Sequence, residues 1–144
     1  MGLFDFAADI GKKLFGDEDD PSEKIQQHNE SDNPGVEGLK VEVEEGVAKV
    51  SGKAKDQSAF EKIVLMAGNV LGIGEVKADE LEVEESTEVK VEYYVIEKGD
   101  TLWGVAKKFL GNGSKYNKIF EDNREVIKDP DLIYPGQKIR IVLD

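Results

Sequence analysis

The chain has 144 residues, which is enough for one medium domain or two small ones. It contains no cysteine, so disulfides, thiolate metal sites and a cysteine nucleophile are excluded. The net charge is −12, and residues 92–144 hold nine basic and nine acidic side chains, so the whole excess lies in residues 1–91. Such a negative field repels nucleic acid and anionic lipid and concentrates cations, so we expect no nucleic-acid partner.

The N-terminus predicts a short helix followed by an acidic loop. Apolar residues on one face of residues 3–15 recur at helical spacing: Leu3, Phe6, Ala7, Ile10 and Leu14. Gly11 lies where this amphipathic helix could end or bend, and residues 16–20 have the composition of a loop. Pro21 then opens a second helix, which the turn at residues 32–35 ends.

The next segment predicts a hairpin, a helix and one further strand. Apolar and charged residues alternate over residues 39–50, on both sides of a Glu-Gly turn, which is typical of a β-hairpin with one buried face. Apolar residues return to helical spacing from Asp56, a residue type that caps helices, to Val70. The Gly-Ile-Gly sequence at residues 72–74 breaks this helix, and the valines and leucine of residues 76–83 indicate a strand.

The C-terminal third predicts two strands that enclose two helices. Asp100 and Thr101 are alternative caps for the first of these helices. We expect the following order: a strand at 94–96, a helix at 102–109, a helix at 114–123, a long turn at 130–136 and a strand at 139–142.

The charged residues suggest no catalytic set. His28 is the only histidine, and no motif places a nucleophile or a metal partner beside it. Paired carboxylates are abundant along the chain, so none is singled out for acid–base chemistry. Residues 17–20 are like the opening of a calcium loop, but Pro21 follows and the turn glycine is missing. We therefore expect no enzymatic activity.

Two segments resemble known domain families. The chain resembles a LysM module in the run Tyr-Val-Ile-Glu-Lys-Gly-Asp-Thr-Leu-Trp-Gly-Val-Ala-Lys-Lys-Phe at 94–109 and in Leu-Ile-Tyr-Pro-Gly-Gln-Lys-Ile-Arg-Ile-Val at 132–142. It resembles a BON domain in Val-Glu-Val-Glu-Glu-Gly-Val-Ala-Lys-Val-Ser-Gly at 41–52 and in Val-Leu-Gly-Ile-Gly-Glu-Val at 70–76. This order of domains, after an N-terminal Met-Gly-Leu-Phe, is similar to the family of small bacterial potassium-binding BON–LysM proteins.

This resemblance implies an α+β fold with two small domains, an α/β sandwich BON domain and a βααβ LysM domain. We place the boundaries as follows: N-terminal helix and loop 1–22, BON domain 23–85, linker 86–91 and LysM domain 92–144.

The resemblance also implies selective binding of the potassium ion, K+. K+ is large and weakly hydrated, so neutral carbonyl oxygens suit it better than clustered carboxylates, and such oxygens are free where helices end. Two helix ends supply the candidate ligands, which are Ala7, Ile10 and Gly11 at the first and Gly72 and Ile73 at the second. The alternative is that these glycines only bend a helix and shape a loop.

In LysM relatives a polymer of N-acetylglucosamine lies between two loops. The matching residues here are Gly99, Asp100, Thr101 and Leu102 in the first loop, and Pro130, Asp131, Leu132 and Ile133 in the second. The same loops are also part of the fold of the module. Their presence is therefore equally consistent with a module that folds and does not bind sugar. Trp103 and Tyr134 could stack on a ligand or belong to the core.

Nothing at the N-terminus resembles an export signal or a membrane span, because Asp5 and Asp9 interrupt the first apolar segment. We therefore expect a cytoplasmic monomer that acts as a potassium sensor or buffer. Two alternatives stay open. One is a cell-envelope adaptor whose LysM domain binds peptidoglycan, and the other is a protein-interaction module that has lost both ligand sites.

Overall fold

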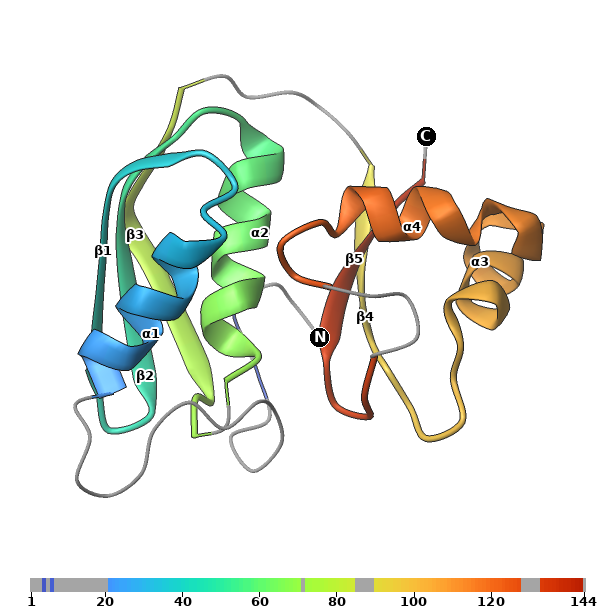
Figure 1. Cartoon of the computed structure of the whole chain (residues 1–144), viewed down its shortest axis with the longest axis horizontal. Helices are drawn as coiled ribbons and strands as arrows, with labels where there is room; N and C mark the ends of the chain where they lie inside the picture. The colour runs from blue at the N-terminus through green and yellow to red at the C-terminus, as the bar shows by residue number, and fades with distance from the viewer. Residues whose placement is uncertain are drawn as a thin grey trace.

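The computed structural model describes residues 4, 6, 21–70, 72–84, 90–127 and 133–143. Its helices and strands form two small α+β units side by side, as the sequence predicted (Figure 1). The first unit contains three strands and two helices, and the second contains two strands and two helices with a short 3-10 turn.

The first unit is a two-layer sandwich. Its elements are α1 (Pro21–Ser31), β1 (Val36–Glu44), β2 (Val47–Ala54), α2 (Gln57–Gly68) and β3 (Glu75–Val83). The sheet order is β1-β2-β3, with β1 antiparallel and β3 parallel to β2, so α2 is the crossover that a parallel pair requires. Both helices cover one face of the sheet, where Ile25, Val50 and Ile63 are fully buried.

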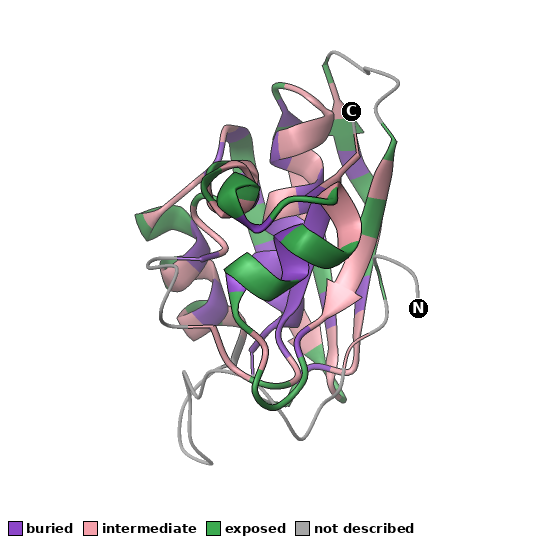
Figure 2. Ribbon diagram, turned by 90° about the vertical axis from the view of Figure 1, so that its right-hand side faces the viewer, coloured by how far each residue is buried: buried purple, intermediate pink, exposed green. Residues whose placement is uncertain are grey.

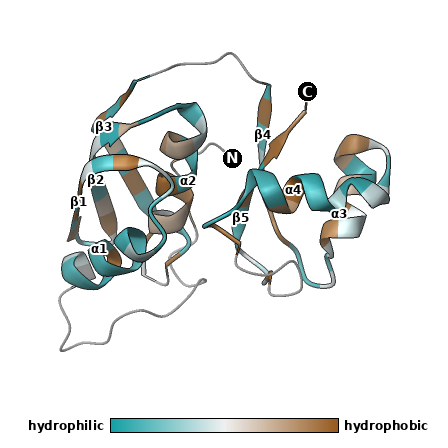
Figure 3. Ribbon diagram, turned by 45° about the horizontal axis from the view of Figure 1, so that its top comes forward, coloured by the Kyte–Doolittle hydropathy of each residue, from teal (hydrophilic) through white to brown (hydrophobic). Residues whose placement is uncertain are grey.

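The period-two pattern of the strands explains why only one face is covered. Val41, Ala48 and Val76 point into the core, whereas Lys40 and Lys49, next to them in sequence, are exposed. The alternation of apolar and polar residues along these strands is visible in Figure 3. Both strands of the hairpin extend beyond the predicted residues 39–50, because pairing also joins Val36 to Ala54 past an irregularity in the register.

Helix α2 begins as predicted and ends earlier than predicted. The Asp56 side chain accepts a hydrogen bond from the Ala59 N–H at 2.8 Å, which confirms the cap. The helix ends at Gly68 rather than at the break predicted for residues 72–74. The next residue, Asn69, is the C-terminal cap, with its backbone N–H bonded to the Leu65 carbonyl and its side chain bonded to the second domain.

The second unit has the predicted βααβ order. Its elements are β4 (Val91–Val95), α3 (Leu102–Leu110), a 3-10 turn (Gly113–Lys115), α4 (Tyr116–Asp122) and β5 (Lys138–Val142). The strands β4 and β5 are antiparallel, and β4 begins at the end of the expected linker, where Val91 pairs with Val142. The structure also decides between the two alternative caps, since the Thr101 hydroxyl accepts the Gly104 N–H at 3.1 Å.

Strand β5 of the second unit contacts the first unit. Ile139 and Ile141 belong to the core formed with α3 and α4, while Lys138 and Arg140 alternate with them and meet α2 through the bonds described below. All four side chains are buried, and Figure 2 shows the buried residues concentrated in the centre of the molecule. The sheet of the second unit is therefore covered on both faces.

Candidate cation site and domain junction

The described part of the N-terminal segment pairs with the start of β3. The Phe6 N–H donates to the Gly74 carbonyl at 3.0 Å, and the Phe4 carbonyl accepts from the Val76 N–H at 2.9 Å. The Phe6 ring fills the space in front of Gly68, where an added Cβ would lie 2.1 Å from ring carbons. Gly68 therefore permits the close approach of this segment to α2.

The loop after α2 contains two of the expected ligand residues, Gly72 and Ile73. Gly72 has φ +103°, a conformation that favours glycine, and the Gly74 N–H donates to the Gly46 carbonyl at 2.9 Å. Within the described residues, no donor bonds the carbonyl oxygen of Gly72 or Ile73. These uncharged acceptors are the chemistry that the sequence argument required of a potassium ligand.

Three of the sequence-predicted ligands, Ala7, Ile10 and Gly11, lie outside the described residues. Gly72 and Ile73 are described, and Ile73 is fully buried. Across the described ranges there is no cluster of three or more histidine, aspartate or glutamate side chains that could hold a metal ion. The described region thus offers carbonyl oxygens but no carboxylate cage.

Asn69 joins this region to the second domain. Its side chain bonds both backbone groups of Lys138, with Nδ2 donating to the carbonyl and Oδ1 accepting from the N–H, each at 2.8 Å. The Tyr134 hydroxyl donates to the Asn69 carbonyl at 3.1 Å. One residue beside the candidate loop therefore holds both the strand and the last turn of the second domain.

A buried ion pair forms the centre of the junction. Arg140 Nε donates to Glu61 Oε1 at 2.8 Å, and the two residues are only 5% and 3% exposed. Arg140 Nη1 also donates to the Asp122 carbonyl at 2.8 Å and to the Ser58 hydroxyl at 3.3 Å. Burial, and then the charge of Glu61, raise the pKa of Tyr93 from β4. The sequence analysis missed this pair, because Glu61 and Arg140 each resemble a solvent-facing residue of an amphipathic element.

The loops of the predicted sugar groove are described only in part, since Pro130, Asp131 and Leu132 lie outside the described residues. Gly99 and Thr101 are exposed, whereas Leu102 is buried in the domain core and could contribute only its backbone. Ile133 is half-buried against the same core.

The Asp100 carboxylate is hydrogen-bonded within the first loop. It accepts the Tyr94 hydroxyl at 2.5 Å and the Glu97 N–H at 2.8 Å, and these bonds hold the pKa of its carboxyl below the ordinary value. The same hydroxyl bond, followed by burial, raises the pKa of Tyr94 to about 12.

The two aromatic candidates for sugar stacking differ in their surroundings. Trp103 is 54% exposed, and its indole lies over Gly113 and near the ring of Tyr116, with the ring centres 6.1 Å apart. Tyr134 is half-buried and bonds the first domain. Of the two, Trp103 presents a ring to solvent and Tyr134 belongs to the junction.

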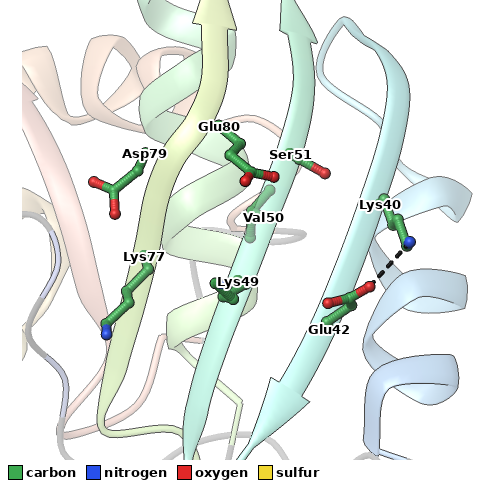
Figure 4. Close-up of a pocket in the computed structure, with 8 residues that line it drawn as sticks. All are labelled: Lys40, Glu42, Lys49, Val50, Ser51, Lys77, Asp79 and Glu80. Atoms are coloured by element: carbon green, nitrogen blue, oxygen red, sulfur yellow. Dashed lines mark ion pairs between the residues drawn. The ribbon is translucent and has the colours of Figure 1, made fainter.

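A separate hollow of about 150 Å³ lies on the uncovered face of the three-stranded sheet (Figure 4). Its rim carries lysines and carboxylates together, among them the ion pair of Lys40 and Glu42 at 2.9 Å. Because the charges are mixed and their side chains reach into solvent, the hollow selects no class of ligand, and no sequence-predicted site residue lines it.

Comparison with known proteins assigns the two units. The BON domain family matches residues 17–85, and the LysM domain family matches residues 94–142. The chain is 38% identical over 148 aligned residues to the potassium binding protein Kbp of Escherichia coli O6:H1, with 98% of each chain covered. It belongs to the Kbp family. Expectations for the fold and the family are both confirmed.

Two further relatives are similar over a third of this chain only. The uncharacterized protein YqbP of Bacillus subtilis is 40% identical over 57 residues, which are 26% of its own length. The spore coat assembly protein ExsA of Bacillus cereus is 40% identical over 48 residues, which are 7% of its length. These matches have the size of one domain, whereas the Kbp match spans both. In the described residues, no helix has the length and apolar character that crossing a membrane requires.

Proposed function

We propose that this protein binds K+ selectively through backbone carbonyl oxygens, and that it acts in the cytoplasm as a potassium sensor or buffer without catalytic activity. The observation that carries the proposal is the similarity to Kbp over 98% of both chains. The bonding at the loop after α2 supports it, because Gly72 and Ile73 offer neutral oxygens beside the paired N-terminal segment.

Selectivity for K+ needs several neutral oxygens at a spacing set by the fold. Gly72 and Ile73 supply two carbonyl groups in this proposal, and Ala7, Ile10 and Gly11 supply the others. Phe6, which directly precedes Ala7 in the chain, pairs with Gly74 of this loop. The excess of negative charge in residues 1–91 raises the local concentration of all cations, so geometry has to select among them.

Thermal unfolding of desalted protein in potassium, sodium and calcium chloride at matched ionic strength tests the proposal, because general screening then cancels. Binding to the folded state alone stabilises it by about 2.7 kcal/mol at a hundredfold excess over Kd. For a chain of this size, that corresponds to a rise in Tm of roughly 8 °C. We expect this rise with potassium only. Equal curves in potassium and sodium would contradict the proposal, and a rise with calcium alone would assign the site to carboxylates.

A matched pair of glycine variants locates the site. Gly72 and Gly38 both have positive φ, at +103° and +65°, so an alanine strains the backbone at either position. An added Cβ at Gly38 has no atom within 4 Å, so strain is its main effect. We expect Gly72→Ala to lose the potassium response and Gly38→Ala to keep it. Loss of the response in both variants would mean that general stability, and not the loop, controls binding.

A second candidate function is peptidoglycan binding by the LysM domain, as in an envelope adaptor. The match of residues 94–142 to the LysM family and the exposure of Gly99 and Thr101 favour it. Retention of the purified protein on insoluble peptidoglycan would support this function. A Thr101→Pro variant that still folds is the control. If the wild type is retained no more than this variant, the result counts against peptidoglycan binding.

A further inference from the structure

The hairpin turn between β1 and β2 lies against the candidate cation loop. Glu44 pairs with Val47, so the turn consists of the two residues between them. Both of these residues, Glu45 and Gly46, have positive φ, at +50° and +78°, which is typical of a type I′ turn. Val47 also pairs with Glu75 of β3, so the turn and the loop after α2 lie at the same end of the sheet (Figure 1).

Gly46 meets the loop at two points. Its carbonyl accepts the Gly74 N–H at 2.9 Å, which ties the loop to the turn just before the first pair of β2 and β3. A Cβ added to Gly46 would lie 3.2 Å from the carbonyl oxygen of Gly72, which is closer than ordinary van der Waals contact. Gly46 therefore bonds the loop and also leaves open the space beside the Gly72 oxygen.

The position of the Gly72 carbonyl matters because oxygens that replace the hydration shell of an ion discriminate by their number and spacing. We propose that Gly46 is a positioning residue of the cation site, which sets the place of the Gly72 carbonyl and thereby the preference for K+ over Na+. This inference rests on the proposed function and adds the hairpin turn to the site. Gly46 acts through the loop, since its own carbonyl is bonded to the Gly74 N–H.

A methyl group at position 46 tests this role. In Gly46→Ala the Gly72 oxygen has to give way by a few tenths of an ångström, and close-packed groups resist such shifts. We expect the affinity for K+ to fall about tenfold, which corresponds to about 1.4 kcal/mol. The affinity for Na+ should fall by less than about threefold, because the spacing of the oxygens is not fitted to that ion.

The matched control is Gly38→Ala. Gly38 also has positive φ, at +65°, so an alanine strains the backbone there too, but an added Cβ has no atom within 4 Å. Isothermal titration calorimetry of the full chain with potassium chloride, in tetramethylammonium chloride, measures the affinity for K+. Repeating the titration at rising sodium chloride gives the affinity for Na+ by competition. Urea unfolding without potassium compares the stability of the variants, because a loss of stability alone lowers both apparent affinities by the same factor.

The outcomes separate the two proposals. Wild-type K+ affinity in Gly46→Ala, in a wild type that binds K+, overturns this inference alone. An equal fall for both ions, or an equal fall in Gly46→Ala and Gly38→Ala, overturns it as well. If sodium competes in none of the proteins, the K+ affinities of the two variants decide.

Absence of K+ binding in the wild type overturns the proposed function and this inference together. If Gly46→Ala does not fold, Gly46→Asn places the same Cβ with less strain, because asparagine tolerates positive φ. Gly38→Asn is then the control, and the same criteria apply.

Discussion

Replacement of Arg140 by methionine tests how strongly the two domains are joined. The change keeps an unbranched stem in the junction and removes the three donor contacts of the guanidinium group. Glu61 stays behind as a carboxylate that is only 3% exposed and has lost its cation. Removing one partner of a buried ion pair typically costs about 3–5 kcal/mol, because the other charge is left without compensation. For a chain of this size we expect Tm to fall by roughly 10–15 °C.

Urea unfolding at a fixed potassium concentration measures this loss by two signals. Far-UV circular dichroism follows both domains, and the fluorescence of Trp103, the one tryptophan of the chain, follows the LysM domain. We expect the two transitions to coincide in the wild type, because the buried junction couples the domains. In Arg140→Met the fluorescence and dichroism transitions should separate as the domains unfold independently.

Two further variants serve as controls. Arg124→Met removes an ion pair with Glu121 in which the Arg124 side chain is 56% exposed and the Glu121 side chain is 59% exposed. We therefore expect the free energy of unfolding to change by no more than about 0.5 kcal/mol. The double change Glu61→Leu with Arg140→Met removes both charges and should recover most of the lost stability. A wild-type midpoint for Arg140→Met would refute the reasoning. A double variant as unstable as the sum of its single changes would refute it as well.

Two other predictions concern single residues. Gly68→Ala places a Cβ 2.1 Å from the Phe6 ring, so we expect a loss of about 1–3 kcal/mol in urea unfolding, together with weaker potassium binding because the N-terminal segment must move. Wild-type potassium affinity in this variant would show that the segment does not support the site. The lowered pKa of Asp100 predicts stability that is present above its ordinary pKa of 3.8 and is lost as pH falls through the lower folded value. The acid unfolding of Asp100→Asn should lack this component, and profiles that coincide with the wild type in that range would contradict the assignment.

Local patterns in the sequence predicted the elements of both domains. Asp56 caps α2 because its short side chain reaches the backbone N–H of Ala59. The alternation of apolar and charged residues over 39–50 produces a hairpin with one buried face. The end of α2 was predicted too late, since the pattern of apolar residues continues through Val70. The helix stops at Gly68, and the next residue, Asn69, bonds Lys138 of the second domain, a contact that no local signal in the sequence indicates.

For the candidate site, the sequence pointed to the loop of Gly72 and Ile73 by its glycines, and the structure adds what surrounds it. The close approach of Phe6 to Gly68 and the buried ammonium of Lys138 depend on segments far apart in the chain. Side-chain periodicity cannot place such residues together, because it describes one element at a time.

The sequence by itself determined which elements form, which face of each is apolar, and to which families the two domains are similar, because these depend on periodicity, caps and turn residues within short windows. Only the tertiary structure decided what covers the polar face of β5. Lys138 and Arg140 alternate with isoleucines as in a strand with one solvent-facing side, yet both are buried against the first domain, Lys138 by contacts with Phe6 and Asn69 and Arg140 by contacts with α2. The burial of Arg140 is possible because Glu61 compensates its charge, and the ammonium of Lys138 lies over the Phe6 ring.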